Sequence, residues 1–152
     1  DFWRAKYGGV NDVLARPLVR GQVDEGRSEL RVLRRVRHPN ITLFYGCMLL
    51  EGVYYLITEL VPGLNLRAYV QQRHQDGSRE ANLTRGGKLY EQILLAEVTH
   101  ALHYLHSQDP VVLHRNLTPE AIGVQTTRTP PRARIVDFSL SCVLDGSEAD
   151  GQ

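Results

Sequence analysis

The stretch Leu113-His114-Arg115-Asn116-Leu117-Thr118-Pro119-Glu120-Ala121 and the tripeptide Asp137-Phe138-Ser139 form a pair of linked motifs in the last third of the chain. Between them lie two short apolar runs, 121–124 and 133–136, which are separated by Pro130-Pro131 and predict small strands around a loop. Two motifs in a fixed order are a far more specific signal than either alone. Chance agreement is therefore a poor explanation for the pair.

A long amphipathic helix is predicted over residues 93–106, just upstream of the first motif. Its apolar face, which we expect to be mostly buried, carries Leu94, Val98, Ala101, Leu102 and Leu105. A short helix over 66–72 follows the break at Pro62-Gly63, and the polar stretch 73–87 predicts a mobile loop. A small strand is also expected over 111–117, and the acidic residues 145–152 should fray.

The first sixty residues are rich in β patterns. Runs 2–7 and 13–19 flank Gly8-Gly9-Val10-Asn11, and runs 41–50 and 53–60 flank Glu51-Gly52, which predicts two hairpins. Between the hairpins, residues 24–36 carry apolar side chains at helical spacing. A β-rich part with one helix followed by a helical part with small strands indicates an α+β fold in two lobes.

Composition limits the classes of partner. The chain has 152 residues, 42% of them hydrophobic, which suffices for one ordinary core. Its net charge of +1 provides no field toward nucleic acid or anionic lipid, so neither is expected as a partner. Cys47 and Cys142 give no disulfide framework or zinc spacing and fit a reducing compartment. With no signal-peptide pattern and no run near ~20 apolar residues, a cytoplasmic location is expected.

The stretch 113–121 resembles the protein-kinase catalytic loop H-R-D-L-K-P-E-N, and Asp137-Phe138-Ser139 stands at the distance of its D-F-G. The resemblance extends over the whole chain, and the approach Ser-Gln-Asp-Pro-Val-Val-Leu-His looks most like the tyrosine-kinase-like group of serine/threonine kinases. It implies a bilobal kinase-like fold with part of the N-lobe in 1–60, the hinge in 61–63 and part of the C-lobe in 64–152. The further motifs that carry the resemblance are His38-Pro39-Asn40-Ile41, Thr58-Glu59-Leu60-Val61-Pro62-Gly63 and Tyr104-Leu105-His106.

Scaffold positions of the family are retained in this sequence. By the resemblance, Arg16 matches the lysine of the third kinase strand and Glu29 matches its partner on helix C. Thr58 matches the gatekeeper, and Glu59 and Val61 match the hinge positions whose backbone meets adenine. An apolar stack between the lobes is implied at the positions Leu33, Phe44, His114 and Phe138.

Positions that carry the chemistry are mostly changed. Asn116 replaces the aspartate that takes the proton of the substrate hydroxyl, and an amide cannot take up a proton at neutral pH. Thr118 replaces a lysine that faces the transferring phosphate, so one positive charge is lost. Ala121 replaces the asparagine that holds the second magnesium ion, which leaves Asp137 as the remaining metal ligand. The resemblance therefore implies a pseudokinase that binds protein partners in signalling.

Nucleotide binding is expected to be weak. Arg16 keeps the charge of the lysine but has a different shape, and Leu14 stands where a small alanine normally lies above adenine. Gly123 stands where a leucine normally lies below it, so we expect a crowded roof and an empty floor. A register shifted by one residue puts Ala15 at the roof and Pro17 at the lysine position. In either register, ATP and Mg²⁺ are at most weak cofactors.

Two alternatives to the pseudokinase remain open. A serine/threonine kinase could retain slow ATP-dependent phosphotransfer, or the chain could be a non-functional truncated fragment. Truncation is expected because the family's glycine-rich loop would precede Phe2 and its activation segment would follow Ser139. The apolar face of 93–105 then lacks its normal partner and is expected to form an exposed patch. A basic edge on the helix at 24–36 is another candidate binding surface, carried by arginines 27, 31, 34, 35 and 37.

Overall fold

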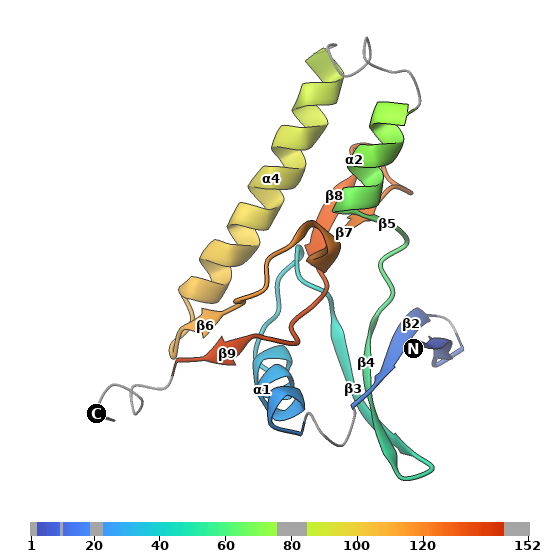
Figure 1. Ribbon diagram of the computed structural model, residues 1–152, viewed down its shortest axis with the longest axis vertical. Helices are drawn as coiled ribbons and strands as arrows, with labels where there is room; N and C mark the ends of the chain where they lie inside the picture. Colours follow the sequence, from blue (N-terminus) through green and yellow to red (C-terminus); the bar gives the residue numbers. More distant parts are fainter. Residues whose placement is uncertain (1–2, 10, 19–22, 76–84, 145–152) are drawn as a thin grey trace.

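The computed structural model describes residues 3–9, 11–18, 23–75 and 85–144 and confirms the α+β class. An antiparallel sheet with one helix forms the N-terminal part, and helices with small strands form the rest (Figure 1). The strand order of the first sheet is β1-β2-β4-β3. Its strands are β1 (Trp3–Tyr7), β2 (Asn11–Pro17), β3 (Phe44–Leu50) and β4 (Val53–Glu59).

Both predicted hairpins are confirmed, with Tyr7 opposite Asn11 and Leu50 opposite Val53. The predicted strand 41–50 is wrong at its start, because Ile41 forms a parallel bridge to Ile135 and β3 begins only at Phe44. The run predicted over 13–19 forms β2 as far as Pro17, and Phe2, Val10 and Val19 lie outside the described residues.

Helix α1 (Val23–Leu33) occupies most of the predicted helix 24–36. The prediction is wrong at the C-terminal end, since the chain turns at Arg34 and Arg35. Val36 nevertheless stays buried, because the turn returns it to the core beside Val32 and Leu33.

Helices α2 (Leu66–Gln75) and α4 (Arg85–His106) lie side by side at one end of the molecule (Figure 1). The loop predicted over 73–87 is therefore wrong at both ends, while residues 76–84 lie outside the described part of the chain. Likewise α4 begins at Arg85 and not at residue 93. Among the helices that the structure describes, none has the length and apolar character that a membrane span requires.

Short strands complete the C-terminal part. A three-stranded sheet has the order β5-β7-β8, with β5 at Gly63–Asn65, β7 at Ile122–Gln125 and β8 at Arg132–Ile135. Strand β6 (Val112–Leu113) pairs with β9 (Cys142–Val143), and η2 (Pro119–Ala121) is one turn of 3-10 helix. The runs expected at 121–124 and 133–136 are confirmed to within one residue, whereas the strand expected over 111–117 is reduced to two residues.

The break predicted at Pro62-Gly63 is the start of strand β5, and Gly63 explains why. Its φ of +146° lies outside the range that other residues readily adopt, and a Cβ there would collide with the Val124 carbonyl oxygen. Without a side chain, the backbone of β5 approaches β7 closely enough to pair with it.

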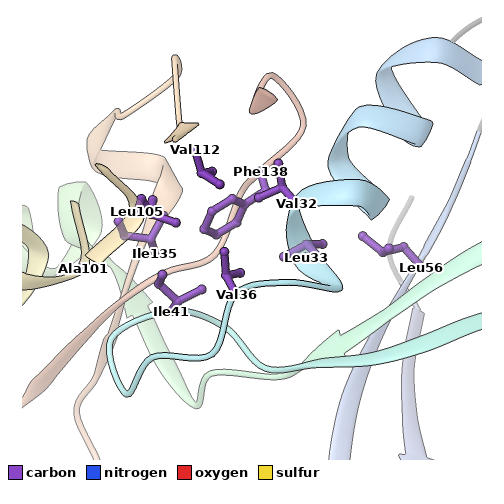
Figure 2. Close-up of a cluster of buried hydrophobic side chains, with 10 residues drawn as sticks. All are labelled: Val32, Leu33, Val36, Ile41, Leu56, Ala101, Leu105, Val112, Ile135 and Phe138. Atoms are coloured by element: carbon purple, nitrogen blue, oxygen red, sulfur yellow. The ribbon is translucent and has the colours of Figure 1, made fainter. Parts of the chain in front are cut away.

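The main core joins the two parts of the molecule (Figure 2). Phe138 lies at its centre, with side chains of α1 on one side and side chains of α4 and β8 on the other. Burying each large apolar side chain of this kind stabilises the fold by about 1.5–3 kcal/mol. The fully buried members with the largest side chains are Val32, Leu33, Leu105, Val112, Ile135 and Phe138.

The segment between α1 and β3 fixes the position of β8. The Asn40 side chain donates from Nδ2 to the Ala133 carbonyl (2.9 Å), and the Ile135 amide donates to the Asn40 carbonyl (2.8 Å). The Thr42 amide in turn donates to the Ile135 carbonyl (2.9 Å). These bonds hold the N-terminal sheet and the strand that leads to Asp137 in one arrangement.

Candidate functional site

The Arg16 guanidinium of β2 forms an ion pair with the Glu29 carboxylate of α1. The Glu29 side chain is 5% exposed and the Arg16 side chain 27%. Burial raises the pKa of Glu29, the Arg16 bond and charge lower it, and the nearby Asp137 charge raises it again. In the two alignments considered above, either Arg16 or Pro17 stands at the family's lysine position. The ion pair favours the alignment with Arg16, because Arg16 is the residue that contacts the acid of α1.

Leu14 and Thr58 lie directly opposite each other on β2 and β4. Thr58 is buried and also faces Phe44 of β3, which packs against the main core. The predicted roof and gatekeeper positions are thus neighbours on the same part of the sheet.

The predicted hinge residues make contacts that the sequence does not reveal. Glu59 forms an ion pair with Arg134 of β8, which connects the end of β4 to the small sheet. Val61 and Val136 lie against Gly123, where an added Cβ would be 3.2 Å and 3.1 Å from their Cγ1 atoms. The expectation of an empty floor at Gly123 is therefore wrong, because these two valines occupy the space.

His114 lies against the ring of Phe138, with ring centroids 5.0 Å apart and planes at 65°. Its Nδ1 accepts a hydrogen bond from the Asn116 amide (3.3 Å), and within the described chain its buried Nε2 has no partner. Burial lowers the pKa of His114, and the backbone and charge of Asp137 act in the opposite direction. Leu33 belongs to the same buried cluster as Phe138, and Phe44 packs against that cluster. With the contact between His114 and Phe138, these residues form the expected apolar stack.

The residues at the altered chemical positions serve the local structure. Thr118 is the N-cap of η2, and its hydroxyl oxygen accepts from the Ala121 amide (3.3 Å). Ala121 is 1% exposed and accepts a hydrogen bond at its carbonyl from the Val136 amide (2.9 Å). The Asp137 carboxylate accepts from the Ser139 amide of its own turn (3.0 Å). Thr118, Ala121 and Asp137 thus each take part in the local hydrogen bonding of their own turns.

Asp137 carries the one carboxylate at the two metal positions that the family resemblance implies. Mg²⁺ requires near-octahedral oxygen ligands, and protein sites use one or two carboxylates together with phosphates. Ala121 offers no side-chain ligand, and the described residues contain no group of three or more histidines, cysteines or acids that could hold a metal. Of these two positions, only Asp137 can therefore supply a side-chain oxygen to a metal ion.

An apolar groove of about 590 Å³ lies between α2 and α4, beside the catalytic-loop stretch. Leu95 on its wall is 62% exposed. The predicted apolar face of this helix is buried at Leu94, Val98, Ala101 and Leu105, so the expectation that it is mostly buried is confirmed and the expected exposed patch on that face is wrong. Arg35 and Arg37 of the basic edge instead donate to backbone carbonyls, Arg35 to that of Asp109 (2.8 Å). The remaining lining residues that the two helices contribute are Leu66, Tyr69, Val70, His74, Glu91, Leu94 and Val98.

Two buried or half-buried acids hold elements together through contacts that the sequence did not reveal: Glu97, which no motif singles out, and Glu59, which was expected only as a hinge position. Glu97 of α4 accepts from the Ala133 amide (2.6 Å) and pairs with Arg132, which fixes β8 against the helix. Glu59 pairs with Arg134 in the same strand. The signal available in the sequence was Arg-x-Arg on a short strand, which predicts two cations on one face but not their partners.

Comparison with known proteins places these features in context. A family model of the protein kinase domain matches residues 16–150. The serine/threonine-protein kinase DCLK1 of Rattus norvegicus is 30% identical over 88% of this chain and 28% of its own length. The probable serine/threonine-protein kinase SIS8 of Arabidopsis thaliana is 25% identical over 91% of this chain and 12% of its own. The serine/threonine-protein kinase CTR1 of the same plant is 27% identical over 91% and 16%. The chain thus spans less than a third of the length of these relatives.

Proposed function

The chain belongs to the protein kinase family, and from that premise we propose that it is a pseudokinase, impaired in phosphoryl transfer and acting in signalling through protein contacts. The observation that carries the proposal is the loop from Asn116 to Ala121. It stands where the family's catalytic loop stands in the sequence, but Thr118 caps a 3-10 turn and Ala121 is buried.

Three separate contributions to catalysis are missing from this loop. Asn116 cannot accept the hydroxyl proton, and a positioned base contributes about 10²–10⁴-fold to rate. Thr118 supplies no positive charge, and its oxygen accepts the Ala121 amide. Ala121 supplies no metal ligand. Because these losses affect different parts of one transition state, restoring a single one leaves the others in place.

The retained parts support a scaffold. The Arg16–Glu29 pair joins β2 to α1, and the stack around Phe138 joins both to α4 and β8. A family member can use such a framework to present surfaces to other proteins. The groove between α2 and α4 is apolar and partly exposed, which is the character of a protein-binding surface.

The second candidate is slow phosphotransfer, which the Asp137 carboxylate near the Arg16–Glu29 pair favours. Weak ATP binding at Thr58 to Val61 belongs to that candidate. A cytoplasmic location belongs to the pseudokinase proposal. It rests on the thiols of Cys47 and Cys142, which are both free.

Transfer of labelled γ-phosphate to a generic substrate separates the two candidates. We expect no incorporation above background from the chain or from Asn116→Asp, because Thr118 and Ala121 remain unchanged in that variant. Robust incorporation by the unmodified chain would overturn the pseudokinase proposal.

A thermal-shift titration with ATP, with and without magnesium, tests the nucleotide. A ligand present near its Kd stabilises the folded state by only about 0.4 kcal/mol, so the expected shift is small and does not depend on magnesium. Ala121→Asn is the informative variant, because Gly123→Leu would press on Val61 and Val136 and change the fold as well as the site. A large magnesium-dependent shift in the unmodified chain would favour the kinase candidate.

A further inference from the structure

Strand β3 forms one edge of the four-stranded sheet, and its outer half is apolar and exposed. The side chains of Met48, Leu49 and Leu50 are 44%, 57% and 50% exposed, and the segment Cys47–Leu50 carries no charge. Val53 and Tyr54 extend this surface onto β4. Natural sheets rarely leave a long apolar edge strand uncovered.

The hydrogen bonds of β4 show which backbone groups of β3 point outward. The Leu18 amide donates to the Tyr54 carbonyl (2.7 Å), so the backbone groups of Tyr54 face β2. Leu49 is opposite Tyr54 in the antiparallel register, and in such a pair its own N–H and C=O point away from the sheet. Cys47, two residues earlier, has the same orientation. Within the described chain, no residue bonds to the outward groups of these two residues.

The two edges of the sheet differ in charge. The other edge, β1, carries Arg4 and Lys6, and pairing it with a copy of itself would bring like charges together. Cys47–Leu50 contains neither a cation to repel a copy nor a charge to select an acidic or basic peptide. The same strand of a second copy matches this segment, because antiparallel pairing about a two-fold axis places its uncharged residues opposite one another.

We propose that β3 pairs with β3 of a second copy of this chain, antiparallel and with the two-fold axis at Met48. Cys47 then lies opposite Leu49 of the second copy, and the two such pairs exchange the outward N–H and C=O groups of all four residues. The interface is isologous and closes at two copies. The inference goes beyond the proposed function and does not depend on whether the chain transfers phosphate.

The position of the hairpin separates this surface from the apolar groove. Figure 1 shows the β3–β4 hairpin at the end of the molecule away from α2 and α4. A dimer through β3 therefore leaves the groove open, and a lysine introduced on one surface does not touch the other.

Sedimentation equilibrium over the micromolar range provides the first test. The chain should dimerise, and Met48→Lys, which places two lysines across the axis, should weaken the dimer at least about tenfold. The matched control is Leu95→Lys, an equally drastic change at an exposed leucine in the groove, which should leave the dimer within about twofold. The proposal is overturned if the unmodified chain is monomeric. It is also overturned if Leu95→Lys abolishes the dimer while Met48→Lys does not.

A charge exchange tests the position of the axis. Met48→Lys mixed with Met48→Glu should form a heterodimer, because opposite charges then face each other, while each variant alone stays monomeric. In a background of Cys47→Ser and Cys142→Ser, Met48→Cys should form a disulfide dimer under oxidation, since directly opposite residues in a non-hydrogen-bonded pair lie about 4.5 Å apart. Leu50→Cys should not. Failure of both the heterodimer and the Met48→Cys dimer rules out this pairing.

Discussion

The Arg16–Glu29 pair and the loop from His114 to Ala121 both lie within the electrostatic influence of Asp137. The charge of Asp137 raises the pKa of Glu29, and it also acts on His114. The pair keeps the residue types that the family resemblance requires, an acid on α1 and a cation on β2. In the loop, His114 contacts Phe138, while Asn116, Thr118 and Ala121 differ from the residue types that the family resemblance requires.

The difference follows from what each side chain does for folding. Glu29 is buried, so without Arg16 it would be an unpaired charge inside the protein. The lysine and asparagine that the family resemblance implies at positions 118 and 121 would act on a substrate and would not stabilise the core. In their place, Thr118 caps η2 and Ala121 contributes a buried methyl group. Retained geometry is therefore weak grounds for inferring retained chemistry.

The largest expected effect breaks the pair. Arg16→Met should reduce the free energy of unfolding by about 2–3 kcal/mol, below the range for fully buried pairs because Arg16 is partly exposed. Urea denaturation measures it. Lys6→Met is the control, since the Lys6–Asp12 pair (2.8 Å) is more than half exposed and should contribute less than about 1 kcal/mol. Equal effects of the two substitutions would show that the pair has no special role.

The second effect is a dependence on pH. Burial holds the pKa of His114 below its ordinary value of 6.5, so the unfolded chain binds more protons as the pH falls below that value. Stability should therefore fall as the pH is lowered through 6.5, by at most about 1.4 kcal/mol per pH unit for one group.

His114→Phe isolates this contribution from that of the other histidines. The difference in the free energy of unfolding between the unmodified chain and the variant should change with pH between pH 7 and pH 5. The raised pKa of Glu29 changes stability with pH in the opposite direction, but it does so in both proteins and cancels in this difference. Parallel curves for the two proteins would contradict the expectation.

The third effect concerns the loop alone. Thr118→Ala removes the N-cap of η2 and should cost about 1 kcal/mol in chemical denaturation. Thr118→Ser keeps a hydroxyl oxygen and should be close to neutral. If both substitutions cost the same, the methyl group of Thr118 and not its cap stabilises the loop.

The smallest effect is expected at the position of the lost base. Asn116→Asp should change stability by no more than about 0.5 kcal/mol, because the hydrogen bond from Asn116 to His114 uses the backbone amide of Asn116. It should also leave phosphotransfer at background. A strong gain in transfer from this one substitution would show that the loop differs from an active one only in its base.

The sequence predicts best where pattern and packing agree. The hairpins at Gly8-Gly9 and Glu51-Gly52 follow from turn chemistry, and Arg16 and Glu29 follow from the family positions. The start of α4 was missed because Gly86 and Gly87 each disfavour a helix by about 1 kcal/mol, a weak preference that the surrounding structure overrides. Strands β6 and β9 have two residues each, too few to show a period.

Contacts between distant segments could not be predicted where the family resemblance does not imply them. The filling of the space at Gly123 depends on Val61 and Val136, which approach it only in the folded chain. The Glu59–Arg134 pair spans 75 positions of sequence. The cap of Thr118 is different, because a threonine before a proline and an acid is a local signal for the start of a helical turn, and it was available in the sequence.

The bond from Asn40 to the Ala133 carbonyl, across 93 positions, has a consequence for synthesis on the ribosome. Local hairpins such as β3–β4 can form as soon as they emerge, but the segment around Asn40 and Ile41 receives its partner strand β8 only after the intervening residues have been added. At about 5–20 residues per second, this takes roughly 5–20 s. During that interval Val32, Leu33 and Val36 lack Phe138, and the nascent chain presents an uncovered half of its core to chaperones and to its neighbours.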